Sequence, residues 1–237
     1  ETNFDDEFVL YSPGVCKWLK EVAKLECGYL TDQHEHALHK AAANGHWEVC
    51  AFLLQDAPNL LNKQDSVNHQ TAVMWAAAMG HVDVVRSLAK EGAKLDNFSS
   101  AGLNAFMFGA KFGRTSVCEA LMGVAKDKKA PNPLTVKAEK TGCTGIFFAV
   151  DGGYLDTVDF FINSFPASDR TKYINTQNKL QETPLMRAAQ GGHKDLIELL
   201  LKFGSIQNHF KFIKLLQCSK TFLITYHKRQ TLLIIVA

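Results

Sequence analysis

The chain has 237 residues, of which 46% are hydrophobic and 21% are charged, as in an ordinary soluble folded protein. This length allows one large domain or two small ones. The net charge of +2 provides no bulk attraction to nucleic acid or to an anionic membrane, so we expect neither as a partner.

The six cysteines are spread along the chain, and the closest two, Cys16 and Cys27, stand eleven residues apart. No Cys-x-x-Cys pair of the kind that holds zinc or performs redox chemistry is present. Scattered thiols in a chain of this size favour reduced core residues over a disulfide framework.

The stretch "SPGVCKWLKEVAKLECG" near the N-terminus has apolar residues at spacings of three and four, which predicts a helix. We expect residues 1–30 to form a frayed acidic end followed by this helix, which would cap whatever structure comes next. Because the chain begins with Glu1 and has no signal peptide, we expect it to be a fragment or a processed chain.

Residues 34–46 read "HEHALHKAAANGH" and hold four of the nine histidines. A zinc protease helix needs His-Glu-x-x-His, because histidines four apart lie on one helix face. Here Leu38 stands four residues after His34, and His39 comes one residue too late. We therefore expect no metal site from His34, His36, His39 and His46.

The same stretch recurs along the chain, as "HQTAVMWAAAMGH" at 69–81 and "QETPLMRAAQGGH" at 181–193, with weaker copies at 102–114 and 142–154. Its glycines fall at positions 45, 80, 113, 153 and 192. This pattern and its period near 33 residues resemble the ankyrin repeat. The resemblance covers residues 31–208 in five copies, which we place at about 31–65, 66–98, 99–138, 139–177 and 178–208.

The resemblance implies an all-α solenoid of about five helix–turn–helix repeats with short turn or β-hairpin tips and a helical cap at each end. The position before each first helix is filled by His36, Thr71, Asn104, Thr144 and Thr183, and the four other than His36 should act as N-caps. The repeated glycine should end the first helix with a positive φ. His39, and the histidines that follow the glycine, should tie neighbouring repeats together.

Two long spacings and the tail depart from the pattern. The lysine-rich segment 123–140 and the segment 164–180 should be exposed excursions, although the lysine-rich one could also be a docking site. Residues 209–237 should form a C-terminal cap, with a helix near 210–216, or the start of a further element. The apolar run "TLLIIVA" is too short for a complete membrane span.

The chain contains no phosphate-binding GxxxxGKS or GxxxxGKT loop, no GxSxG nucleophile elbow and no kinase motif, so we expect neither an enzyme nor a cofactor. The resemblance implies a monomeric protein–protein interaction module of scaffold or adaptor type, cytoplasmic or alternatively nuclear. The alternative is that this chain is the regulatory or targeting arm of a longer protein, such as a kinase or a membrane protein.

By resemblance, the partner-binding positions are turn residues before the N-cap and first-helix residues before the glycine. We expect the partner to dock across the second and third copies on Val67, Asn68, Gln70, Met79, Leu103, Lys111 and Phe112. Val67, Met79, Leu103 and Phe112 would form an exposed apolar patch with a polar rim. The alternative is that some of these four side chains pack between repeats.

Overall fold

A computed structural model describes residues 37–204 and two short strands at 222–226 and 232–236. The predicted capping helix within residues 1–30 and the predicted helix near 210–216 lie outside the described residues. The chain divides into two compact units, residues 1–145 and 146–237, and each is taken by itself.

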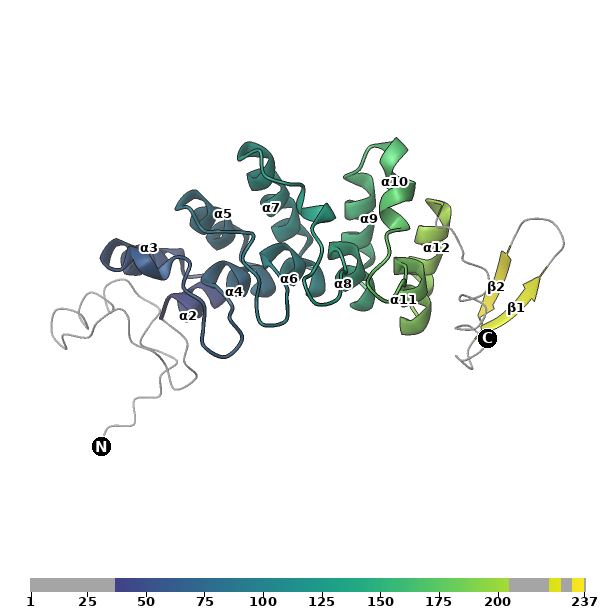
Figure 1. The fold of residues 1–237 in the computed structure, drawn as a ribbon, viewed down its shortest axis with the longest axis horizontal. Helices are drawn as coiled ribbons and strands as arrows, with labels where there is room; N and C mark the ends of the chain where they lie inside the picture. The colour runs from purple at the N-terminus through teal and green to yellow at the C-terminus, as the bar shows by residue number, and fades with distance from the viewer. Residues whose placement is uncertain (1–36, 205–221, 227–231, 237) are drawn as a thin grey trace, which may run out of the picture. The chain divides into compact units, whose positions relative to one another are not determined.

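From residue 37 on, the first unit forms three consecutive helix pairs (Figure 1). The first helices of the pairs are α2 (Ala37–Ala43), α4 (Ala72–Met79) and α6 (Ala105–Lys111), and the second helices are α3 (Trp47–Asp56), α5 (Val82–Lys90) and α7 (Thr115–Asp127). Helix α4 packs between α2 and α6, and α5 packs between α3 and α7. Two 3₁₀ turns, η1 (Pro58–Leu60) and η2 (Pro133–Thr135), follow α3 and α7.

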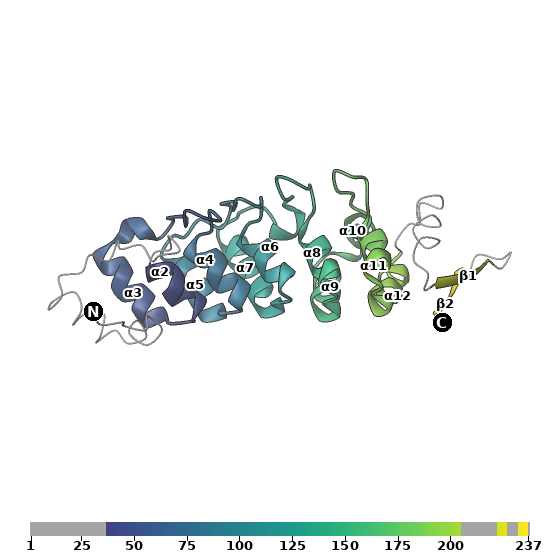
Figure 2. The same ribbon diagram turned by 90° about the horizontal axis from the view of Figure 1, so that it is seen from below.

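First and second helices bury different kinds of surface. The first helices are rich in alanine, and nearly every residue of α4 and α6 is buried, so backbones can approach closely on several sides. Helix α5 is amphipathic and buries Val84, Val85, Leu88 and Ala89. Within the first unit the turns that connect the pairs project to one side of the helices (Figure 2).

The second unit contains α8 (Gly145–Asp151), which begins at the boundary residue, then α9 (Leu155–Asn163), α10 (Ala167–Ile174), α11 (Pro184–Gly191) and α12 (Lys194–Lys202). Two antiparallel strands follow, β1 (Phe222–Tyr226) and β2 (Leu232–Val236), with Phe222 opposite Val236. The predicted helix–turn–helix repeats are confirmed, whereas this hairpin was not predicted.

Helix α10 corrects the expectation that residues 164–180 form an exposed loop. The segment packs on α9, and Tyr173 and Ile174 are buried. The ring of Phe165 stacks on that of Tyr173 with centroids 4.2 Å apart. The insertion therefore adds a helix with an apolar side rather than a solvated excursion.

The predicted N-caps are confirmed at two positions. Asn104 Oδ1 accepts from the Met107 amide at 3.0 Å, and Thr183 Oγ1 accepts from the Met186 amide at 3.4 Å. At Thr71 the prediction is wrong, because the Met74 amide bonds to the backbone carbonyl of Thr71 instead. The buried hydroxyl groups of Thr71 and Thr144 have no hydrogen-bond partner among the described residues, and His36 lies outside them.

The repeated glycine has a positive φ in all five copies, as predicted. At three of these glycines, a side chain of the next repeat packs against the glycine. An added Cβ would come within about 3 Å of that side chain, which is His81 at Gly45, Arg114 at Gly80 and His193 at Gly153. Each of these side chains belongs to the residue that directly follows the glycine of its own repeat. His81 Nε2 also donates to the Ala43 carbonyl at 2.8 Å, and Arg114 Nε donates to the Ala78 carbonyl at 3.1 Å. These side chains join neighbouring repeats.

Cys50, Cys118 and Cys143 are buried, as expected of core thiols. Burial raises the pKa of the Cys50 and Cys118 thiols to about 12. No helix in the described part of the chain is long and apolar enough to cross a membrane.

Gly192 and Gly123 form a matched pair for testing the left-handed helix end. Neither would bring an added Cβ within 4 Å of a neighbouring atom, but Gly192 has a φ of +73° and Gly123 lies inside α7. Gly192→Ala should lower the free energy of unfolding by about 1 kcal/mol, because an L-residue is strained there. Gly123→Ala should raise it by about 0.5–1 kcal/mol. Equal shifts in denaturant midpoint for the two variants would contradict the assignment.

Thiol labelling tests the buried cysteines. With a pKa of about 12, roughly one Cys50 or Cys118 thiol in ten thousand is ionised at pH 8, and the thiolate is the reactive form. Brief iodoacetamide treatment of the folded chain should leave both thiols unmodified, and the same treatment in urea should label both. Peptide mass spectrometry measures the labelling. Native labelling at the rate of an exposed cysteine would show that these sites are open.

Candidate functional site

The carboxylate of Asp65 organises the turn between the first two helix pairs. Asp65 is only 1% exposed, and its oxygens accept hydrogen bonds from the backbone amides of Val67, Asn68 and Gln70 at 3.2, 2.6 and 3.1 Å. A charged acceptor shared by several amides fixes a turn firmly. Three predicted site residues therefore take their positions from one buried side chain.

The same carboxylate also holds an aromatic ring on helix α4. Trp75 Nε1 donates to Asp65 Oδ2 at 3.2 Å, and the ring is half-buried. Trp75 lies four residues before Met79, so the two side chains share a face of α4. Trp75 was missed as a site residue, although its spacing of four from Met79 in the sequence could have identified it.

Met79 and Phe112 are exposed, as predicted, with exposed fractions of 46% and 41%. Each stands immediately before the glycine that follows its first helix, and α4 packs against α6, so the two lie in matching positions on neighbouring repeats. Lys111 is also exposed, with its Nζ 5.7 Å from the centroid of the Phe112 ring. We call the surface made by Trp75, Met79, Lys111 and Phe112 the α4–α6 face.

Leu103 is not part of an exposed patch, which corrects the sequence-based expectation. Its exposed fraction is 5%, and it lies at the base of its turn, where its amide donates to Ser99 Oγ and its carbonyl accepts from the Ser99 amide. Leu103 directly precedes the cap residue Asn104, whereas Val67 stands four residues before Thr71. The two residues therefore occupy different positions in the repeat.

Val67 is 59% exposed but lies at the turn, before the start of α4, whereas Met79 ends the same helix. Eight helical residues span about 12 Å, so Val67 belongs to the turn rather than to the Met79 cluster. Asn68 is exposed and its carbonyl accepts from the Ser100 amide of the next turn at 2.8 Å, and Gln70 is half-buried. Val67, Asn68 and Gln70 therefore form a rim at the turn, apart from Met79 and Phe112.

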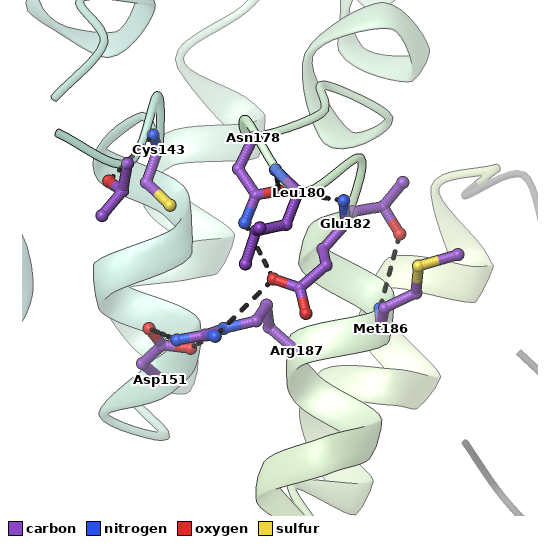
Figure 3. Close-up of polar contacts among 9 residues, drawn as sticks. Cys143, Asp151, Asn178, Leu180, Glu182, Met186 and Arg187 are labelled. Carbon is purple, nitrogen blue, oxygen red and sulfur yellow. Dashed lines mark hydrogen bonds and ion pairs between the residues drawn. The ribbon is translucent and has the colours of Figure 1, made fainter. Parts of the chain in front are cut away.

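In the second unit the equivalent region is charged and internally paired (Figure 3). Arg187 of α11 donates from Nε and Nη2 to the two carboxylate oxygens of Asp151 at 2.8 and 2.6 Å. Its Nη1 lies 3.7 Å from Glu182 Oε2, which accepts from Asn178 Nδ2 at 2.8 Å. Asp151, which stands two residues before Gly153 as Lys111 does before Gly113, is thus held in a network.

The histidine cluster of the sequence resolves into structural roles where it is described. His39 is buried, and its Nε2 lies 3.1 Å from the Lys63 carbonyl, which links α2 to the connection before the next repeat. Among residues 37–204 and the two strands, no group of three or more His, Cys, Asp or Glu side chains could hold a metal ion. His34 and His36 lie outside the described residues, so the absence of a tight metal site stays a prediction.

Comparison with protein families gives one match, to a model of three ankyrin repeats. The model aligns in overlapping registers to residues 9–99, 38–132, 106–211 and 146–236, which together cover most of the chain. The match agrees with the repeat read from the glycine spacing and with the helix pairs of both units.

Several curated proteins are similar over the repeats. XBAT31 of Arabidopsis thaliana, provisionally named as an E3 ubiquitin-protein ligase, is 27% identical over 74% of this chain and 30% of its own length. Ankyrin repeat and KH domain-containing protein mask-1 of Caenorhabditis elegans is 27% identical over 58% of this chain and 6% of its own. Human transient receptor potential cation channel subfamily A member 1 is 25% identical over 73% of this chain and 18% of its own length. The chain thus spans less than a third of each of these relatives.

Replacing Asp65 by Ala tests whether this carboxylate holds the turn and the Trp75 ring. Four donors lose their acceptor, so the free energy of unfolding should fall by about 1–3 kcal/mol. The Trp75 indole proton, followed by NMR, should exchange faster with solvent. Asp83→Ala, which removes an exposed carboxylate from α5, is the control and should change either property little. Equal effects of the two substitutions would refute the role of Asp65.

Proposed function

This chain belongs to the ankyrin-repeat family, and we propose that it binds a partner protein across the α4–α6 face. Ankyrin repeats are a protein-interaction module in which stacked helix pairs offer an extended surface. The partner docks on the second and third repeats, beside the turn held by Asp65.

The exposure of Met79 and Phe112 on adjacent first helices is the observation that carries the proposal. Two large apolar side chains in matching positions on neighbouring repeats expose apolar surface that is costly to leave in water. Methionine and aromatic residues are enriched in the cores of protein interfaces, and polar groups surround them. Trp75 adds an aromatic ring whose position is fixed before binding, which lowers the entropic cost of association.

The polar rim of this surface is also ordered in advance. Asn68 and Gln70 are held through their amides by Asp65, and the carbonyl of Asn68 joins the following turn. Their side chains, together with Lys111, would supply the hydrogen bonds that orient a partner at the edge of an apolar contact. We propose a scaffold or adaptor role, in which this chain brings its partner to another molecule.

A second candidate role is that of a recruiting arm within a longer protein. It is favoured by the relatives, because the chain matches 30% of the length of XBAT31 and 18% of the human channel. In that role the α4–α6 face would select what the rest of the longer protein acts on. The two roles share the same docking surface and differ only in what is attached to it.

Truncation of the two exposed side chains tests the docking surface. The variant Met79→Ala, Phe112→Ala should bind a partner, captured by the full chain and then purified, about 5- to 30-fold more weakly. This loss corresponds to about 1–2 kcal/mol, the scale of ordinary interface hot spots. Isothermal titration calorimetry gives the affinity, and chemical denaturation of the same samples gives the stability.

Met74→Ala, Phe108→Ala is the matched control, because it removes the same residue types from the same region of the chain but from the core. Met74 is 1% exposed and Phe108 is 5% exposed. The control should lose several times more stability than the surface variant, since each core truncation costs about 2–5 kcal/mol. An unchanged partner affinity in the Met79, Phe112 variant would place the docking surface elsewhere.

A further inference from the structure

We propose that the partner segment bound by the α4–α6 face carries a large apolar side chain flanked by aspartate or glutamate residues. The inference rests on the proposed function and specifies the chemistry of the partner. It is drawn from the distribution of charge around Met79 and Phe112, which is one-sided.

The first helices of the first unit contain no carboxylate. Their sequences are ALHKAAA in α2, AVMWAAAM in α4 and AFMFGAK in α6, so their only full charges are Lys40 and Lys111. The second helices, in contrast, carry Glu48, Asp56, Asp83, Glu119 and Asp127. Acidic residues are therefore present in the unit but absent from the helices that form the proposed surface.

Arg114 places a second cation beside the apolar side chains. Its Nε donates to the carbonyl of Ala78 at 3.1 Å. Its Cδ packs so closely on Gly80 that a Cβ added to this glycine would lie 3.0 Å away. Met79 stands between these two residues, so the guanidinium of Arg114 is next to it. In the part of the chain that the structure describes, no ion pair joins Arg114 or Lys111 to a carboxylate.

The acidic residues of the described turns form no ion pair with Lys111 or Arg114, although Asp96, in the turn before α6, is exposed. Asp65 is buried and its two oxygens are already bonded to four N–H groups. Glu139, in the turn of residues 138–143, is followed directly by Lys140, and both are exposed. The second unit provides a contrast, because its first helices place a carboxylate against a cation: Asp151, which stands two residues before Gly153 as Lys111 does before Gly113, is paired with Arg187.

Two cations without carboxylate partners beside exposed apolar side chains favour an anionic segment over a cationic one. A carboxylate that approaches Lys111 or Arg114 gains attraction, whereas a lysine-rich segment meets like charge, so the charge selects the partner as well as strengthening binding. Because each cation lies beside one of the two apolar side chains, the carboxylates should flank the apolar anchor on the partner segment.

Selection from a library of random twelve-residue peptides displayed on phage, with the full 237-residue chain as bait, tests this inference. Enriched peptides should contain Phe, Leu, Met or Trp within a few residues of Asp or Glu. The enriched peptides are then synthesised, and their binding is measured by fluorescence anisotropy. They should bind the Lys111→Glu variant at least about fivefold more weakly than the parent chain, since like charges then face each other. Arg86→Glu makes the same charge change on α5 and should alter binding less than about twofold.

The outcomes separate the partner chemistry from the docking surface. Suppose that the enriched peptides lose affinity in the Met79→Ala, Phe112→Ala variant. If they also lack acidic residues, or bind the Lys111→Glu variant as tightly as the parent chain, the proposed partner chemistry is wrong and the docking surface stands. Peptides that bind that double variant as tightly as the parent chain, or no enrichment at all, would contradict both. Acidic, apolar peptides sensitive to both variants, and weakened by raising NaCl, would support both.

Discussion

The helix pairs of this chain depend on their neighbours, because a single pair is too small to bury its own apolar faces. Helices α2, α4 and α6 have seven, eight and seven residues, lengths at which an isolated helix is marginal in water. Stacking supplies the missing burial, and at three of the repeated glycines a side chain of the next repeat also makes a specific contact. At Gly45 and Gly80 the contact is a side chain of the next repeat that bonds to a carbonyl near the helix end.

The same contacts that stabilise the stack also present the proposed binding surface. Arg114 closes the junction at Gly80 and at the same time leaves its charge beside Met79. Asp65 closes a turn and at the same time fixes the ring of Trp75. Binding residues that are held by the scaffold lose little freedom on association, so the architecture itself contributes to affinity.

The sequence predicted the helix pairs, the left-handed glycines and the exposure of Met79 and Phe112, because each follows from position within a repeated unit. It did not predict the features that depend on contacts between residues of different turns and helices, where the repeats differ in length. Leu103 was grouped with Val67 although it occupies the base of its turn. Helix α10 was taken for a loop because Phe165 and Tyr173, which stack, are separated by polar residues. The role of Asp65 required knowing that Trp75 folds back toward the turn.

The central claim is that a partner contacts the first helices of the second and third repeats, and methionine-methyl NMR tests it directly. The five methionines, Met74, Met79, Met107, Met122 and Met186, all lie in the described residues, and only Met79 is exposed. Titration of the ¹³C-methyl-labelled chain with a bound peptide should shift the Met79 signal most and leave Met122, on the second helix α7, and Met186, in the second unit, nearly unmoved. A large shift of Met122 or Met186 with an unmoved Met79 would contradict the account.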